Sequence, residues 1–218
     1  MGSKYISLCN DARMWKTYSH KNRLVKLLLK EFGKERLDVF TLPDRKWHWR
    51  VLLSAAIFAR EKIPPLKPNT DVLFVTSMIN LAELIAMRPD LSKLRKVLYF
   101  HENQLAYPSR SKGSFFFFFL FLLLTRNSTH SHTYKKKKTD SKGQGDFGLG
   151  WNQIASALVA DRVLFNSQFN MNSFLDGIPT FLNVVPKHSR PDKESIVDDI
   201  REKSRVLFFP LSIEINRF

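Results

Sequence analysis

Four consecutive polar residues, His101-Glu102-Asn103-Gln104, form the group of side chains in this sequence that is best equipped for chemistry. A histidine donates to a sugar hydroxyl or a phosphate, a carboxylate accepts from hydroxyls or acts as a base, and amides both donate and accept. The group follows a short apolar run and ends near Tyr107-Pro108. It therefore indicates a binding or catalytic site. The alternative is a polar loop that only caps the next element.

A second group combines two tryptophans with cations in the segment Trp47-His48-Trp49-Arg50, which Arg45 and Lys46 precede. Aromatic rings stack on nucleobases and cations contact phosphates, so the segment suits contact with a nucleic acid. The alternative is structural, because Trp47 and Trp49 point to different sides of a helix start and one of them then packs as core.

Smaller polar groups lie at the ends of other expected elements. Asn166 and Ser167 end an apolar run, and Ser167 is also a suitable N-cap for the next helix. Asn152 and Gln153 stand at a helix start from which they could reach the same crevice. The sequence contains no P-loop, no nucleophile elbow and no metal-ligand cluster.

The elements that must position these groups alternate between strands and helices. Short apolar runs with β-branched and aromatic residues predict strands that are buried on both faces; they are 37–42, 71–77, 96–100, 161–166 and 205–210. Apolar residues at helical spacing predict helices over 20–32, 47–59, 80–87, 151–160, 168–175 and 193–203. Single helices between strands imply right-handed crossovers and an α/β fold with a Rossmann-like parallel sheet and flanking helices. Ligands of such sheets bind at the carboxyl ends of the strands.

Residues 109–142 differ in composition from the rest of the chain. Five phenylalanines (115–119) precede a leucine run, and four lysines (135–138) follow a Ser/Thr/His segment. Phe and Lys tracts are what oligo-T and oligo-A DNA encode, so we interpret the segment as a disordered insert read through from an unspliced intron. An alternative is an interfacial membrane anchor. However, the apolar run 115–124 is only about half the roughly 20 residues that span a bilayer, and we expect no stable membrane association.

The charge of the chain favours a polyanionic partner. The 218 residues carry a formal net charge of +15, of which the segment 109–142 supplies +7 and residues 1–50 another +7. A basic surface outside the insert therefore keeps nucleic acid as a candidate partner. The alternative is an ordinary lysine-rich, solvated surface. The single cysteine, Cys9, excludes an internal disulfide, which fits a reducing compartment such as the cytoplasm and, in addition, the nucleus.

Three motifs together resemble the tRNA-queuosine α-mannosyltransferase family. They are Thr41-Leu42-Pro43 with 46–50, Leu98-Tyr99-Phe100 with 101–104 and 107–108, and Phe165-Asn166-Ser167 with 169–170. The resemblance runs from about residue 19 to 210 outside the insert. It implies the N-terminal, acceptor-side half of a GT-B glycosyltransferase, which has two Rossmann-like domains. It also implies GDP-mannose as donor, the queuosine of a tRNA anticodon as acceptor, retention of configuration, and no cofactor or metal.

The resemblance also implies roles for individual residues. His101 and Glu102 would be catalytic, and the substrate-binding residues would be Asn103, Gln104, Trp47, His48, Trp49, Arg50, Ser19, His20, Lys21, Asn152, Gln153, Asn166 and Ser167. The family's glycine-rich first loop is represented only by 18–21, without its glycines.

The resemblance divides the chain into five parts. The segment 1–17 matches nothing, the acceptor-side domain comprises 18–108 and 143–210 around the insert, and 211–218 would be a truncated junction to the donor-binding domain. We accordingly expect this chain to be inactive alone. The alternative function is a non-catalytic, basic tRNA- or RNA-binding module.

Overall fold

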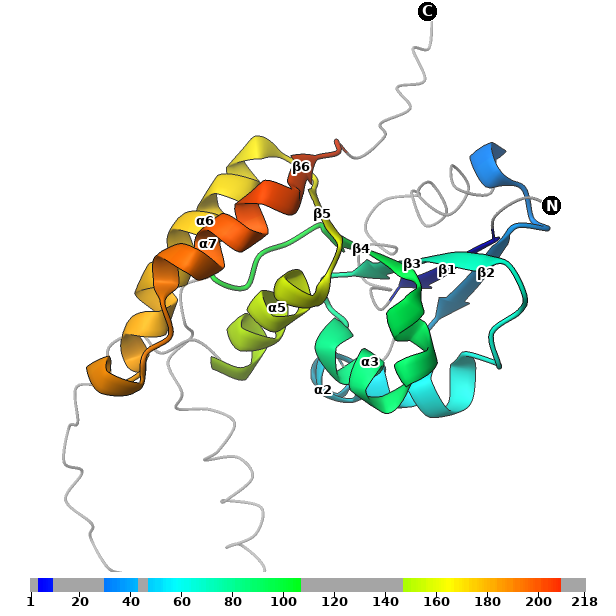
Figure 1. Ribbon diagram of the computed structural model, residues 1–218, viewed down its shortest axis with the longest axis horizontal. Helices are drawn as coiled ribbons and strands as arrows, with labels where there is room; N and C mark the ends of the chain where they lie inside the picture. The colour runs from blue at the N-terminus through cyan, green and yellow to red at the C-terminus, as the bar shows by residue number, and fades with distance from the viewer. Residues whose placement is uncertain (1–3, 10–29, 43–46, 107–146, 209–218) are drawn as a thin grey trace, which may run out of the picture.

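The computed structural model describes residues 4–9, 30–42, 47–106 and 147–208. Its centre is one sheet of six parallel strands in the order β2-β1-β3-β4-β5-β6 (Figure 1). The strands are β1 (Lys4–Cys9), β2 (Leu37–Thr41), β3 (Thr70–Thr76), β4 (Arg95–Phe100), β5 (Arg162–Phe165) and β6 (Ser204–Val206). The α/β class and the Rossmann-like parallel sheet expected from the sequence are confirmed.

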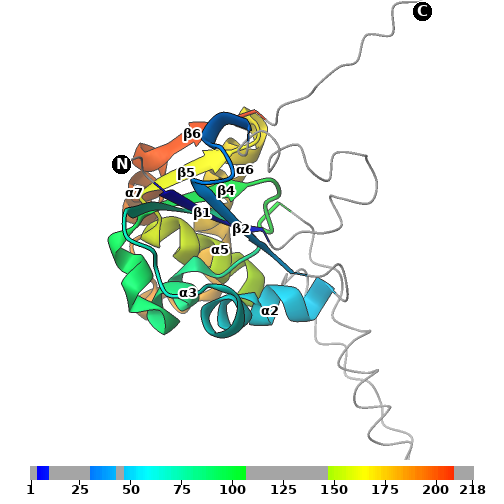
Figure 2. The ribbon, with the colours of Figure 1, turned by 90° about the vertical axis from the view of Figure 1, so that its right-hand side faces the viewer.

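Helices connect the strands. They are α2 (Trp47–Ile57), α3 (Leu81–Met87), α5 (Phe147–Val159), α6 (Gln168–Phe181) and α7 (Lys193–Lys203), with short helical turns at Phe58–Lys62, Pro89–Lys93, Leu182–Val184 and Lys187–Ser189. Five of the six expected helices are confirmed, and the sixth, 20–32, lies outside the described residues except for its end. Figure 2 shows α2, α3 and α5 together on one side of the sheet.

The strand β1 corrects the sequence analysis, which found no element within residues 1–17. The run Lys4–Cys9 pairs with β2 on one side and β3 on the other, so it occupies the interior of the sheet. Its Ile6 and Ser7 are buried. The polar Ser7 interrupts the apolar residues of Lys-Tyr-Ile-Ser-Leu-Cys, whereas the expected signal for a doubly buried strand was a continuous apolar run.

The main core lies between the sheet and the helices. Leu73, Leu98, Phe100 and Phe165 point to this side and are fully buried. The rings of Phe100 and Phe165 stack on each other at 4.7 Å, and both lie against Phe174 of α6. Because successive side chains of a strand alternate between faces, the intervening residues belong to the opposite face, which we call the outer face of the sheet.

Tyr99 of β4 lies on the outer face. Its ring stacks on that of Phe74 of β3 at 6.1 Å, and its hydroxyl donates to the carbonyl of Leu207 at 3.5 Å. Burial raises the pKa of Tyr99 to about 12.

The order of the strands places a topological switch point between β1 and β3. The chain moves outward from β1 to β2, returns past β1 to β3, and then continues in one direction to β6. Open α/β sheets bind ligands outside the carboxyl ends of their strands near such a point. The carboxyl ends of β3, β4 and β5 are therefore the region to search for a site.

The insert 109–142 falls outside the described residues. The elements on either side of it in the sequence, β4 and α5, both belong to the described domain. Among the described helices, none combines the length and the apolar character needed to cross a bilayer.

Candidate functional site

The tetrad 101–104 begins where β4 ends, between the ends of its two neighbouring strands. The amide of Ser77, after β3, donates to the carbonyl of Tyr99 at 2.9 Å, and the amide of Asn166, after β5, donates to the carbonyl of Phe100 at 3.0 Å. The backbone hydrogen bonds of β4 to both neighbouring strands thus continue to the last residues of β4. As expected from the sequence, His101 starts a loop at the carboxyl edge of an interior parallel strand.

Asn166 and the start of α6 hold one side of this loop. The side-chain amide of Asn166 donates to the carbonyl of His101 at 2.9 Å, and Asn170 donates to the side-chain oxygen of Asn166 at 2.8 Å. Ser167 is the N-cap of α6, because its hydroxyl accepts from the amide of Asn170 at 3.1 Å. The structural role expected for Ser167 is confirmed.

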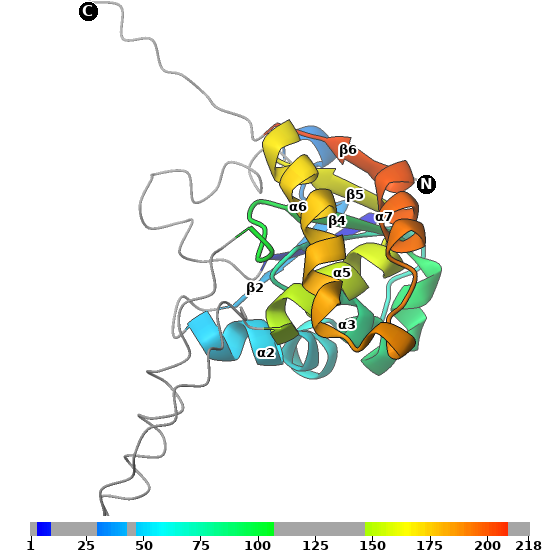
Figure 3. The ribbon, with the colours of Figure 1, turned by 90° about the vertical axis from the view of Figure 1, so that its left-hand side faces the viewer.

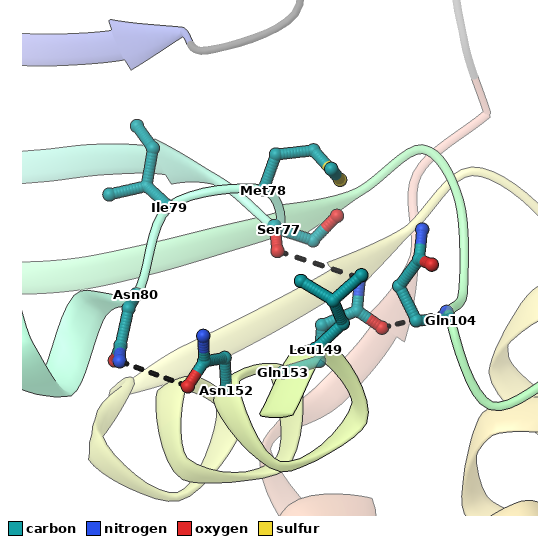
Figure 4. Close-up of a pocket in the computed structure, with 8 residues that line it drawn as sticks. All are labelled: Ser77, Met78, Ile79, Asn80, Gln104, Leu149, Asn152 and Gln153. Carbon is teal, nitrogen blue, oxygen red and sulfur yellow. Dashed lines mark hydrogen bonds between the residues drawn. The ribbon is translucent and has the colours of Figure 1, made fainter. Parts of the chain in front are cut away.

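Gln153 of α5 holds the other side of the loop, and its side chain is only 2% exposed. Its Oε1 accepts from the backbone amide of Gln104 at 2.9 Å (Figure 4). Its Nε2 donates to the carbonyls of Ser77 and Glu102, each at 3.5 Å. One amide therefore ties the end of β3 to both halves of the tetrad.

Asn103 points inward from the middle of the tetrad and is 4% exposed. Its Nδ2 donates to the hydroxyl of Ser173 in α6 at 3.0 Å, and its Oδ1 accepts from the amide of Leu105 at 2.8 Å. The Leu105 side chain in turn fills the space above Gly150 and Gly177, where α5 and α6 approach the loop. Asn103 thus fixes the loop between two helices.

His101, Glu102 and Gln104 are the partly exposed members of the tetrad. The side-chain amide of Gln104 donates from Nε2 to Oε1 of Glu102 at 3.1 Å. The residues that carry an imidazole, a carboxylate and an amide thus lie within four positions at the sheet edge, on a backbone held by Asn166, Gln153 and Asn103. Such fixed groups can bind hydroxyls, transfer a proton or stabilise developing charge.

A small pocket opens beside Gln104. It is lined by residues from the end of β3, the start of α3, the tetrad and α5; they are Ser77, Met78, Ile79, Asn80, Gln104, Leu149, Asn152 and Gln153. Asn80 caps α3 through its Oδ1 and donates from Nδ2 to Asn152 at 3.1 Å (Figure 4). Amides and backbone groups thus dominate the polar lining. In the described part of the chain, no cluster of three or more His, Cys, Asp or Glu side chains could hold a metal ion.

Two comparisons with known proteins give the family of this chain. The family model described as "tRNA-queuosine alpha-mannosyltransferase N-terminal" matches residues 13–124 and 132–211, which is most of the sequence. The chain belongs to this family. It is also 40% identical over 200 residues to the tRNA-queuosine alpha-mannosyltransferase of Drosophila melanogaster; the match covers 90% of this chain and 42% of the relative. The chain thus spans less than half the length of that relative.

The structure brings together seven of the candidate residues that the family resemblance implies, at one edge of the sheet. These are His101, Glu102, Asn103, Gln104, Gln153, Asn166 and Ser167, and Asn152 joins them through the pocket. Trp47, His48, Trp49 and Arg50 form the first turn of α2, and their side chains are outside what the structure describes. Ser19, His20 and Lys21 lie outside the described residues altogether.

Sequence reasoning missed Ser77 and Asn80. Ser77 ends the expected strand 71–77 and Asn80 begins the expected helix 80–87, so the junction between a strand's carboxyl end and a helix was a usable signal. Neither residue belonged to a motif of the resemblance, and a serine or asparagine before a helix is ordinarily interpreted as a cap.

Proposed function

We propose that this chain is the acceptor-side domain of an enzyme that transfers mannose from GDP-mannose to queuosine in a tRNA anticodon. Membership of the tRNA-queuosine alpha-mannosyltransferase family supports this proposal. The observation that carries it is the position of His101 and Glu102 at the carboxyl edge of β4, in the loop whose Gln104 lines the small pocket, and on the strand next to β3, where the switch point lies.

The proposed architecture is the GT-B type, in which two Rossmann-like domains face each other across a cleft. The carboxyl edge of this sheet would form one wall, and a second domain would hold the nucleotide of the donor. The Drosophila relative is more than twice as long as its match to this chain, which leaves room for such a domain. We propose that this acceptor-side domain contacts the tRNA and that transfer of the sugar requires the donor-binding domain as well.

In the proposed mechanism, His101 donates a hydrogen bond to the mannose or to its phosphate as the bond between mannose and GDP breaks. Glu102 orients a hydroxyl of the acceptor or donor. The rigid backbone matters here, because groups that are already in place stabilise developing charge without reorganising during the reaction. The buried amides of Gln153 and Asn103 supply that rigidity from below the loop.

The direct test changes the residue aligned with His101 to alanine in the full-length Drosophila relative and measures mannose transfer. Loss of one preorganised donor is expected to lower turnover by about 100- to 1,000-fold, with tRNA binding unchanged. The matched control changes the residue aligned with the exposed His188 and should keep normal turnover. Normal turnover of the first variant would refute the role of His101.

A second test uses this chain itself. Its affinity for tRNA that contains queuosine is compared with its affinity for the same tRNA with guanosine at that position. The acceptor-side proposal predicts tighter binding of the queuosine form. Equal affinities would favour the non-catalytic RNA-binding alternative.

A further inference from the structure

Three arginines, one on each of three adjacent strands, lie on the same face of the sheet. Val97 of β4 pairs with Arg162 of β5, and Leu164 of β5 pairs with Arg205 of β6. Residues that pair share a face, and so do residues two apart on one strand. Arg95, two residues before Val97, therefore shares the face of Arg162 and Arg205, and all three side chains are exposed.

This face is the outer face, because the neighbouring positions point to the helices. Leu98, Val163 and Phe165 alternate with the arginine-face residues and are completely buried in the core. Figure 3 shows α5, α6 and α7 packed together on the helix side of β4, β5 and β6. The backbone positions of the three arginines thus lie on the face away from these helices, and the guanidinium of Arg205 turns back to the end of α7.

The arginines form a diagonal row. Each step crosses one strand and advances two residues, so successive Cα atoms are about 8 Å apart by ordinary sheet geometry. The row starts at the first residue of β4 and ends at Arg205, one residue before Val206. Val206 pairs with Phe165, which pairs with Phe100, the residue before His101. The row therefore rises from the amino edge of the sheet to the edge that carries the candidate site.

Asp161, the residue before Arg162, forms its ion pair with Lys96, whose position on β4 belongs to the helix side of the sheet. Asp161 accepts from the side chain of Lys96 at 2.9 Å and from its backbone amide at 2.7 Å, and Lys96 and Asp161 are the sequence neighbours of Arg95 and Arg162. Among the described residues, no carboxylate forms an ion pair with Arg95 or Arg162. Arg205 donates from one nitrogen, Nη1, to the carbonyls of Glu202 in α7 at 3.0 Å and of Ser204 at 2.6 Å. The other nitrogens of its guanidinium are left for another acceptor.

We propose that Arg95, Arg162 and Arg205 form a track that binds successive phosphates of the tRNA and leads its anticodon arm to the carboxyl edge of the sheet. This inference deepens the proposed function, on which it rests. Arginine binds phosphate through several donors in a rigid fork, and a linear row suits a phosphodiester backbone. Because backbone contacts do not read the base, the track acts equally on modified and unmodified tRNA.

The test measures the affinity of this chain for an unmodified tRNA transcript as a function of salt. Replacement of all three arginines by glutamine should weaken binding about tenfold or more and lower the slope of log K against log salt by about 2 to 3, since each phosphate contact contributes roughly 0.7 to 0.9. The control is the triple variant Arg60→Gln, Lys62→Gln, Lys187→Gln. It removes the same charge from exposed cations of helical turns, and its slope should change much less.

The outcomes separate this proposal from the proposed function. If both triple variants lose affinity and slope equally, attraction by net charge alone explains the binding and the track is refuted. If the arginine variant keeps tRNA affinity but loses binding to phosphatidylserine vesicles, the row serves a membrane and the proposal fails.

A retained preference for queuosine with no effect of the arginines refutes the track and leaves the proposed function intact. An arginine effect without that preference supports the track and counts against the proposed acceptor. Thermal unfolding of both variants verifies that they are folded.

Discussion

At the scale of single residues, the amides of the site divide into those that hold the backbone of the tetrad and those that do not. Gln153 is buried and serves three backbone groups, whereas Asn152, the residue before it, bonds to one side chain, that of Asn80, although both residues line the pocket. Both are equivalent in the sequence, because a glutamine beside an asparagine at a helix start does not reveal which one the fold uses. Burial separates them.

Gln153→Ala is therefore expected to destabilise the domain by about 1 to 3 kcal/mol, because it removes a buried side chain and leaves the partly buried backbone amide of Gln104 without its acceptor. The free energy of unfolding from urea titration measures this loss. The matched variant Asn152→Ala removes one partly exposed hydrogen bond and should cost less than about 1 kcal/mol. Equal losses for the two variants would contradict the division.

Tyr99 gives a pH dependence at the alkaline end. Its pKa in the folded chain, about 12, exceeds the ordinary value of 10.0 because burial disfavours the phenolate. The neutral phenol thus contributes stability below pH 10, and this contribution is lost as the pH rises from 10 to 12. The loss amounts to roughly 2 to 3 kcal/mol. Between those pH values, the unfolding free energy of Tyr99→Phe should decline less steeply than that of the unchanged chain, and parallel declines would contradict the assignment.

At the scale of elements, the carboxyl edge is set by helix starts that contact the strand ends. Ser167 is both a candidate binding residue and the N-cap of α6, and the helix it caps also supplies Asn170 and Ser173 to the loop of the tetrad. A structural and a binding role predict different results for a conservative change.

Ser167→Ala should lower the free energy of unfolding by about 1 kcal/mol, and Ser167→Asp, which keeps a capping oxygen, should restore most of it. If tRNA binding follows stability in both variants, Ser167 acts only as a cap. Binding that remains impaired in the aspartate variant, at normal stability, would show direct contact with the RNA.

Most elements could be predicted because their patterns are local. Strands 71–77, 96–100 and 161–166 are apolar runs next to turn residues, and the structure has β3, β4 and β5 there. The reason that β1 was missed is not local: Ser7 is polar but completely buried, since it lies in a strand flanked on both sides. Likewise, Ser173, which accepts from Asn103, and the partners of Gln153 are 49 to 76 residues away in the sequence, so only the fold reveals them.

At the scale of the whole molecule, the domain depends on a strand contributed by its first nine residues. β1 separates β2 from β3, so the sheet would lose its continuity without it. Ile6 pairs with Leu73 and shares the main core with it, although its neighbours Tyr5 and Ser7 give little sign of a core strand.

Ile6→Ala is expected to destabilise the domain by about 2 to 4 kcal/mol, comparable to Leu73→Ala, because both changes leave a cavity in the same core. The control Lys34→Ala, at an exposed position between β1 and β2, should change stability by less than about 0.5 kcal/mol. Urea unfolding of the three variants decides the matter. If the Ile6 variant is as stable as the Lys34 variant, the placement of β1 inside the sheet is contradicted. The switch point between β1 and β3, which was used to locate the candidate site, is then contradicted as well.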